Sequence, residues 1–562
     1  MLLLPTRNSN LCRPGPIGPG PRRVYKTRPA LHLSVLQLLL WVLLGKAFFA
    51  QQNDPRLANV LNRPVQLRDG IGRASDSVTT SSTRAQAFYN QGLAYLHSFV
   101  WIEAARSFNE ALRADPNLAM AHLGLSYALG ELGLAEQARS ASRRAAELAK
   151  SVTDREKLRI AVRVSQLEAS ARPGDTALRQ AYRAQLDQLL AKFPDDVESL
   201  LLVGQAQDPG DDHGMGVGSR SLPFYERALA RASDYFAVHH YLTHALENTG
   251  RISEALAHAE RYATSADAIP HAHHMYGHVL RRVGRMGEAV AQFETADRLA
   301  VAYLKTEDVP AEYDWHYRHN LNLLGTAYQY QGRMSAAESV LRRSFELQSI
   351  DHAQDLNRKD WLMFLLARDR AGEALAGARA LTGTGNPLVS ALGHIFASRA
   401  ISGSQPSAAA EEGNTALRQM REAGPRGGVL VPEYQLAQGE YLLRTGQLES
   451  GRRLIREAVG MLRHDSGPDA WMQILFDVEG AARIARAVGD WRLADEMADV
   501  MIEYDPAYGG SQYARALSAE QSGDRVAARA AFEEALRRWA EADSDFPDRL
   551  DAVRRLQAVA DR

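Results

Sequence analysis

The sequence predicts an all-α solenoid, in which successive helical hairpins stack into a superhelix with a concave groove. Three observations lead to this prediction. Small and large apolar residues recur in a frame of 34 residues over much of the chain, and such a period indicates stacked units. The composition, 45% hydrophobic but only 7% aromatic, suits closely packed helices rather than β-domains. Glycine recurs at position 15 of the frame, where it ends the first helix of a hairpin.

The clearest unit spans residues 85–118. Apolar and small residues occupy positions 4, 8, 11, 20, 24, 27 and 32 of this unit, and they are Phe88, Gly92, Tyr95, Ala104, Phe108, Ala111 and Pro116. Two antiparallel helices must cross closely, so small residues lie where the backbones approach and large ones fill the gaps. This pattern resembles the tetratricopeptide repeat. The resemblance implies a groove that binds a protein or peptide partner.

The frame also divides the chain into regions, and it recurs, with gaps, as far as about residue 540. We predict an N-terminal repeat pair at 85–150, a central histidine-rich repeat region at 151–350, degenerate helical repeats at 351–425 and a C-terminal array at 426–562. Consensus residues are missing between 151 and 194, but helices are still expected at 154–170 and 175–192. Groove residues of the N-terminal pair are expected to contact a partner protein, and they include Tyr89, Leu93, Leu123 and Tyr127.

The N-terminal 50 residues are typical of a secretory signal. Basic residues from Arg22 to Arg28 precede an apolar run from Leu33 to Leu44, and small residues follow as far as Ala50. We expect residues 1–50 to be a signal peptide or an uncleaved signal anchor, with 31–50 as the membrane-anchoring part and 51–84 as a linker. The protein is then exported, to the periplasm or another extracytoplasmic space, and touches a membrane only through this segment.

Charge and motifs exclude several classes of function. The chain carries 66 basic and 67 acidic residues, interspersed, so it lacks the basic patch that nucleic-acid binding requires, and we expect no nucleic-acid partner. The sequence contains no HExxH, GxSxG or phosphate-binding glycine loop and no candidate catalytic cysteine, so no known enzyme class is predicted. The single cysteine, Cys12, precedes the apolar run, which leaves nitrogen and oxygen atoms as ligands for any metal.

Histidines are concentrated in the central region. Ten of the 17 histidines lie within the 81 residues from His239 to His319, and nine of these ten are expected on the first helices of three repeats. Two pairs are spaced i,i+4, which places both imidazoles of a pair on one helical face, and we expect the two pairs to stack as a quadrilateral. By the tetratricopeptide resemblance, positions 2, 5 and 9 line the groove. The predicted metal ligands at these positions are His240, His244, His271, His274, His278 and His319.

An all-imidazole site suits a divalent transition metal, and zinc, copper, nickel and iron remain open. A metal-dependent reaction at this cluster also remains open. Glu247 and Asp314 are expected to accept the outer N–H of ligand imidazoles. Arg281 and Arg282 could hold an anion beside the histidines, or be simply solvated or paired with a glutamate. A glycine-rich loop contains Asp208, Asp211, Asp212 and His213, which could fold over the groove or stay solvated. By contrast, His239 and His273 at position 4 are expected to face the partner helix.

Other interpretations of the cluster stay open. The imidazoles could bind an acidic peptide or a carboxylate ligand, or they could be purely structural in a protein-interaction scaffold with no metal and no catalysis. The segments His240-Tyr-Leu-Thr-His244-Ala, His274-Met-Tyr-Gly-His278 and His319-Asn320 resemble those of a group of uncharacterised bacterial repeat proteins, over roughly residues 180 to 335. That resemblance implies a shared site but names no chemistry.

Overall fold

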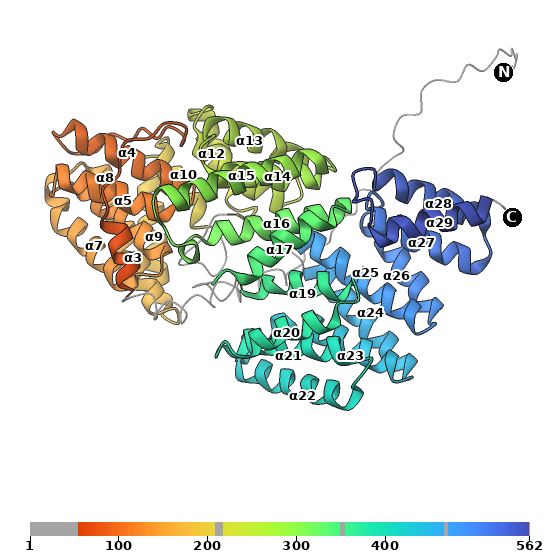
Figure 1. Ribbon diagram of the computed structural model, residues 1–562. Coiled ribbons are helices and arrows are strands. Elements are labelled where there is room, and N and C mark those ends of the chain that lie inside the picture. The colour runs from red at the N-terminus through yellow and green to blue at the C-terminus, as the bar shows by residue number, and fades with distance from the viewer. Residues whose placement is uncertain (1–53, 208–216, 349–354, 466–469, 561–562) are drawn as a thin grey trace, which may run out of the picture.

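The computed structural model describes residues 54–207, 217–348, 355–465 and 470–560, and within these ranges every regular element is a helix. Figure 1 shows the helical hairpins following one another from the N-terminal helices at one end to the C-terminal helices at the other. The predicted all-α solenoid is therefore confirmed. Among the described residues, none of the helices has the length and apolar character needed to span a bilayer.

Two predicted features lie outside the described residues. They are the N-terminal signal at 1–50 and the four loop residues Asp208, Asp211, Asp212 and His213.

The N-terminal part of the solenoid consists of helical hairpins. Its helices are α3 (Pro55–Asn62), α4 (Thr83–His97), α5 (Trp101–Ala114), α6 (Ala119–Glu131), α7 (Ala135–Leu148), α8 (Asp154–Ala171), α9 (Thr176–Lys192), α10 (Val197–Gln205) and α11 (Leu222–Arg231), with a short 3-10 turn η2 (Ala149–Ser151). Helices α8 and α9 match the two helices predicted where the consensus is missing. Thr153 explains the start of α8, because its side chain and Glu156 form a capping box there.

The central and C-terminal parts continue the pattern. The central helices are α12 (Phe236–Asn248), α13 (Ile252–Ser265), α14 (Pro270–Arg282), α15 (Met286–Thr306), η3 (Ala311–Tyr313), α16 (Trp315–Gln331) and α17 (Met334–Glu346). The remaining helices are η4 (Leu356–Arg358), α19 (Lys359–Leu366), α20 (Ala371–Thr382), α21 (Pro387–Ile401), α22 (Pro406–Glu422), η5 (Gly424–Leu430), α23 (Val431–Arg444), α24 (Leu448–Asp465), α25 (Trp471–Ala487), α26 (Trp491–Tyr504), α27 (Gly509–Ser522), α28 (Arg525–Arg538) and α29 (Pro547–Ala560).

The repeat frame has a direct packing explanation. A Cβ added to Gly92 would lie 2.7 Å from the ring of Phe108, and one added to Gly277 would lie 2.9 Å from the ring of Phe293. Both pairs join position 8 of one helix to position 24 of its partner. Glycine at position 8 therefore lets the two backbones approach over a large ring.

The segment at 51–84 differs from the linker that we expected. From Asp54 on it is structured, because Leu57, Val60 and Leu61 bury the apolar face of α3. Beyond α3, residues 66–80 run along α4: Gln91 Nε2 donates to the Gln66 carbonyl, and the Tyr89 hydroxyl donates to Asp76 Oδ2 at 3.0 Å. The chain thus covers part of its own N-terminal repeats.

The prediction that groove residues of the N-terminal pair contact a partner protein is therefore mostly wrong. Tyr89, Leu93 and Leu123 are only 3%, 7% and 4% exposed. Tyr127 is half-buried, with the guanidinium of Arg163 4.2 Å from its ring centroid. These side chains stabilise the solenoid instead of presenting a surface to a partner.

The N-terminal hairpins also pack against the central ones. Buried side chains from α3–α8 and from α10–α14 belong to one hydrophobic core. At its edge the Arg106 guanidinium of α5 reaches Glu103 Oε1 at 2.5 Å and Glu307 Oε2, just after α15, at 2.9 Å. The turn between α4 and α5 lies against α12, α14 and α16, because Phe99 in this turn contacts His240, His271 and His316.

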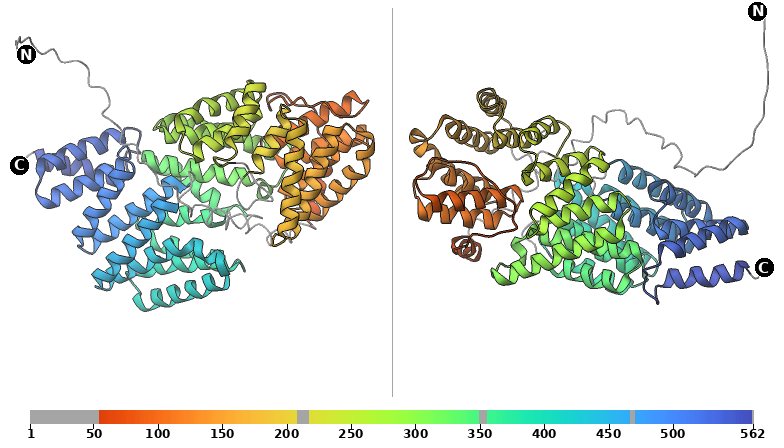
Figure 2. Two further views of the ribbon diagram at one scale, coloured as in Figure 1. Left: turned by 180° about the vertical axis from the view of Figure 1, so that it is seen from behind. Right: turned by 90° about the horizontal axis from the view of Figure 1, so that it is seen from above.

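The C-terminal array folds back on the middle of the solenoid. Helix α16 packs against α25 and α27, and Figure 2 shows these blue helices beside the green central ones. The contact between them includes a hydrogen bond in which the Tyr330 hydroxyl donates to Asp505 Oδ2 at 2.8 Å. The interior here is polar as well as apolar: Asp360 on α19 and Asp477 on α25 are 4% and 1% exposed.

These buried carboxyls predict an unusual dependence of stability on pH. Burial raises the pKa of Asp360 to about 7 and that of Asp477 to about 6. Both groups keep their protons in the folded protein at pH values where the unfolded chain has released them. Their contribution to the free energy of unfolding is therefore fully present below about pH 4 and is lost as the pH rises to about 7.

Asp360→Asn tests this dependence, because asparagine can still accept the hydrogen bond that Gln473 Nε2 donates to Asp360. We expect the variant to be more stable than the parent by about 2–4 kcal/mol at pH 8, with the gain shrinking toward pH 4. Urea unfolding followed by circular dichroism measures the difference. The exposed Asp495→Asn serves as control. A gain that does not change with pH would show that Asp360 is ionised in the folded protein.

Candidate metal centre

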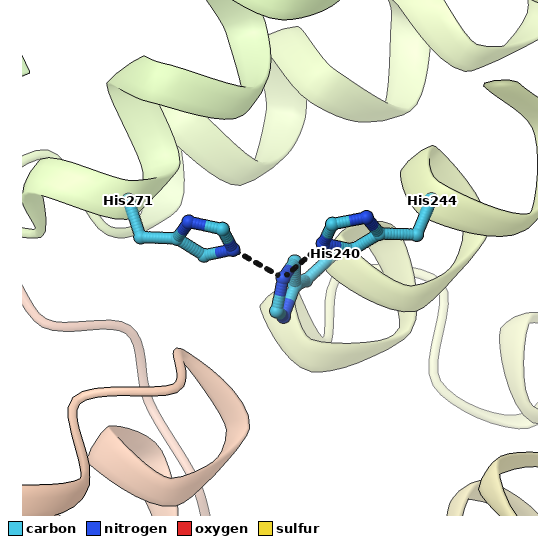
Figure 3. Close-up of side chains that lie close together, drawn as sticks. All are labelled: His240, His244 and His271. Atoms are coloured by element: carbon cyan, nitrogen blue, oxygen red, sulfur yellow. Dashed lines mark hydrogen bonds between the residues drawn. The ribbon is translucent and has the colours of Figure 1, made fainter. Parts of the chain in front are cut away.

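Three imidazoles from two neighbouring repeats converge on one point. His240 and His244 lie on α12, and His271 lies at the start of α14. His240 Nε2 is 2.9 Å from His271 Nε2 and 3.1 Å from His244 Nε2, and Figure 3 shows His240 between the other two rings. Two nitrogens bound tetrahedrally to one zinc ion lie about 3.3 Å apart. This group, the first triad, therefore needs only a slight opening to hold an ion.

The proton of His240 can be assigned from its surroundings. Its Nδ1 lies 2.5 Å from the carbonyl oxygen of His97, which can only accept, so Nδ1 carries the hydrogen. In the neutral ring, Nε2 is then a bare lone pair. One lone pair accepts one well-aligned N–H, yet two imidazole nitrogens face it. A cation at this point would satisfy all three nitrogens together.

The other three predicted ligands form a second triad. His274 and His278 lie on α14 and His319 on α16, and one ligand nitrogen from each lies within 4.8 Å of the other two. His278 Nδ1 donates to Glu247 Oε1 at 2.6 Å, which is the carboxylate–imidazole arrangement found behind metal ligands. However, Arg281 Nη2 donates to His278 Nε2 at 2.9 Å and so competes with an ion for that lone pair.

Outer contacts also fix the second triad. His274 Nδ1 lies 3.1 Å from Asn320 Oδ1, and Asn320 Nδ2 donates to the Phe293 carbonyl at 3.0 Å. Because the amide nitrogen is already committed, the amide oxygen faces His274, and His274 Nδ1 is the donor. Its Nε2 is then the lone pair that can bind an ion.

The grouping of the six histidines differs from the expected quadrilateral of two stacked pairs. Each i,i+4 pair is instead completed by the position-2 histidine of the following repeat, His271 for the first pair and His319 for the second. The start of α14 lies beside the middle of α12, where His271 meets His240, and His319 of α16 lies beside His274 of α14. The structure brings all six predicted residues together, but as two triads rather than one site.

The six imidazoles are buried or half-buried, and three of them have a strongly lowered pKa. Burial, followed by the neighbouring imidazoles, lowers the pKa of His240, His271 and His274 well below the ordinary value for histidine. His240 is fully buried, and His271 and His274 are each 3% exposed. Neutral imidazoles keep the lone pairs that a metal ion needs, so these three rings can bind an ion without losing a proton first.

Two further histidines belong to this region and were not predicted. His97, at the end of α4, supplies the carbonyl for His240, while its own ring contacts the Tyr241 hydroxyl at 3.1 Å and Glu198 Oε2 at 2.9 Å. His316 packs against His271 with ring centroids 4.0 Å apart, and neither of its buried ring nitrogens has a hydrogen-bond partner among the described residues. His316 precedes the first position of the repeat frame, but α16 begins one residue earlier, at Trp315.

Of the two carboxylates expected behind the metal ligands, only Glu247 contacts a ligand imidazole. Glu247 lies behind His278 as expected, whereas Asp314 instead caps α16 by accepting from the Tyr317 N–H at 3.2 Å, and burial raises its pKa to about 6. Arg281 is buried and contacts the second triad, whereas Arg282 is half-buried.

The two position-4 histidines face their partner helices as predicted. His239 Nδ1 lies 2.8 Å from His258 Nδ1 of α13, and His273 Nδ1 lies 2.7 Å from Gln292 Oε1 of α15.

Comparison with known proteins adds little to this geometry. No protein-family model matches the chain, and no curated protein matches it significantly. The crystal structure of yeast Tom70 aligns at 14% identity, over 85% of this chain and 95% of that one, with a TM-score of 0.30. At that level the similarity carries no argument about what this protein binds. The resemblance to histidine-rich bacterial repeat proteins stays a prediction, and the helical hairpins support a tetratricopeptide-like solenoid.

Proposed function

We propose that this protein binds a transition metal ion inside its solenoid, through His240, His244 and His271. The observation that carries the proposal is the convergence of three Nε2 atoms, of which one is shown to be a lone pair by the His97 carbonyl. The second triad is a candidate for a second ion. Zinc, copper, nickel and iron all accept imidazole ligands.

We further propose that the protein is exported, because the basic and apolar pattern of residues 1–50 is that of a secretory signal. The second candidate function is an interaction scaffold without metal, which stacked repeats support as a class. The two functions are compatible, since four of the six histidines are buried and the other two are half-buried, which leaves exposed residues of the helices for a partner.

Two tryptophans provide an intrinsic probe of the proposed site. Trp101 and Trp315 stack with ring centroids 5.4 Å apart, and Trp315 lies 6.3 Å from the ring of His319. We expect added Cu²⁺ or Ni²⁺ to quench their fluorescence and the quenching to saturate at one or two equivalents, because a paramagnetic ion in either triad would lie close to these rings.

The control is a Trp101→Phe/Trp315→Phe double variant, which removes the probe and keeps every imidazole. It should lose most of the quenching but bind as much metal as the parent by elemental analysis. Equal quenching in parent and double variant would place the ion elsewhere. The absence of both quenching and metal uptake in the parent would leave the scaffold function.

A further inference from the structure

The C-terminal half of the solenoid contains a group of charged and polar side chains in its interior. They come from the first helices of consecutive hairpins, α19, α21, α23 and α25, which pack against one another. We call this group the interior polar cluster, and it consists of Lys359, Asp360, Arg399, Glu433, Gln473 and Asp477. Lys359 is half-buried, and the other five residues are at most 8% exposed. The cluster is therefore built into the protein rather than spread over its surface.

Both cations of the cluster already have a carboxylate partner. Lys359 Nζ lies 2.6 Å from Glu433 Oε1, and Arg399 donates to both oxygens of Glu440, from Nε at 3.2 Å and from Nη2 at 2.7 Å. Asp477 is the carboxylate that is left over. Its Oδ2 is 3.8 Å from Lys359 Nζ, and its Oδ1 is 3.9 Å from Arg399 Nη1. Both distances are too long for a hydrogen bond.

Several buried atoms of the cluster consequently have no hydrogen-bond partner among the residues that the structure describes. Both oxygens of Asp477 are in this state, although its side chain is 0% exposed. The same holds for three further acceptors and one donor, which are Asp360 Oδ1, Gln473 Oε1, Glu433 Oε2 and Arg399 Nη1. Buried polar atoms without partners are rare and costly. Such a concentration of them indicates a site for a polar occupant.

The chemistry of these atoms defines the occupant. Five of the six unpartnered atoms are acceptors, so the occupant must bring hydrogen-bond donors. The two cations of the cluster also face four carboxyls, counting Glu440, and two negative charges are in excess when all four are ionised. A primary ammonium group supplies one positive charge and three N–H donors. Ordered water would supply donors but would leave the excess charge uncompensated.

We propose that the interior polar cluster binds the primary ammonium group of a small organic amine, with Asp477 as its ion-pair partner and Asp360 and Gln473 as hydrogen-bond acceptors. Gln473 and Asp477 are spaced i,i+4 on α25 and so share one face of that helix, and Gln473 Nε2 donates to Asp360 Oδ2 at 3.3 Å. These three side chains thus lie together, and burial of the cluster favours a small molecule over a segment of a partner protein.

The two cations argue against a metal ion at the same place. A metal ion attracts ligand atoms from all sides, and Lys359 and Arg399 each lie within 4 Å of Asp477. An ammonium group needs acceptors only along its three N–H bonds, and its carbon chain can lie toward the cations. The site shares no residue with either histidine triad, so the proposal is independent of metal binding.

Isothermal titration calorimetry of the untagged protein at pH 8 tests the proposal, with butylammonium chloride as the probe. Burial raises the pKa of Asp360 to about 7 and that of Asp477 to about 6, so both carboxyls are ionised at this pH. We expect saturable binding of one butylammonium per chain. Tetramethylammonium, which has the charge but no N–H donor, and calcium should both bind at least about tenfold more weakly.

Asp477→Asn is the decisive variant, because it removes the negative charge and nearly keeps the shape of the side chain. It should lower the affinity for butylammonium at least about tenfold, since hydrogen bonds to charged groups are the stronger ones. Asp495→Asn, at an exposed position of α26, is the matched control and should bind as the parent does. If Asp477→Asn does not fold, Asp360→Asn replaces it, with an expected loss of at least about fivefold.

Three results would overturn the proposal. The first is equal affinity for butylammonium in the parent and in the folded Asp477→Asn variant, or in Asp360→Asn where that variant replaces it. The second is tighter binding of calcium or tetramethylammonium than of butylammonium. The third is the absence of saturable binding of butylammonium by the parent, which would leave ordered water as the partner of these buried atoms.

Discussion

Replacing His240 by alanine should lower the affinity of the first triad for its metal ion by at least about 100-fold. The Nε2 atom of His240 lies between the other two ligand atoms, 2.9 Å from His271 Nε2 and 3.1 Å from His244 Nε2. Its removal leaves only two of the three nitrogen ligands and takes away the central one. Loss of a residue that merely supports a ligand already costs 10- to 100-fold in metal affinity, and loss of the ligand must cost more. Competition titration in a His274→Ala/His319→Ala background, in which only the first triad keeps its three histidines, measures the change.

The matched control is His273→Ala, on α14, the helix that carries His271. Its ring pairs with Gln292 Oε1 and the Asp267 carbonyl and takes no part in either triad. This variant should bind metal as the parent does. If His240→Ala and His273→Ala behaved alike, the ion would lie outside the first triad.

Arg106→Ala should lower the free energy of unfolding by about 3–5 kcal/mol, since removing one member of a buried ion pair leaves the other uncompensated. Arg106 is 2% exposed and bridges Glu103 and Glu307, while its Nη2 donates to the Pro64 carbonyl at 3.0 Å. Burial raises the pKa of Glu103, and the positive charge of Arg106 opposes that rise. Chemical denaturation at pH 7 measures the loss.

This substitution should also weaken metal binding, because Arg106 joins α5 to Glu307 after α15, and the turn just before α5 places the His97 carbonyl against His240. Arg113→Ala on α5 is the control: its side chain is 45% exposed and pairs with Glu110 of the same helix, so we expect a loss of about 1 kcal/mol or less. Comparable losses in the two variants would mean that the bridge to Glu307 contributes little.

Much of the fold could be predicted because, in a repeat protein, most packing contacts join helices that are adjacent in the sequence. Gly92 over Phe108 and Gly277 over Phe293 are contacts between helices adjacent in sequence, so their spacing is visible in the frame. The burial of the segment from Asp54 to Thr80 was not predictable in this way. Three apolar residues in one short helix carry little periodic signal. The contacts of the segment also follow no repeat spacing, since Asp76 pairs with Tyr89 whereas Arg63 pairs with the Glu307 carbonyl, 244 residues away.

In the candidate site, too, contacts within one helix could be predicted from the sequence, whereas contacts between helices could not. Helical periodicity placed His240 with His244 and His274 with His278 on single faces, and the structure agrees. The completion of each pair by the next repeat depends on how neighbouring first helices pack against each other, which the periodicity within one helix does not contain. The contacts of His97 and Phe99 depend on the closure of the solenoid across 143 residues in the case of His97 and His240, and only the folded structure reveals them.

The most direct test of metal binding is elemental analysis of the untagged protein, purified without chelator, beside a variant with His240, His244 and His271 changed to alanine. We predict about one equivalent or more of a transition metal in the parent, and in the variant at least one equivalent less. Retention of folding, checked by circular dichroism, makes the comparison valid. Metal absent from the parent even after loading with copper(I) and zinc(II), or bound equally by parent and variant, would contradict the proposed metal site.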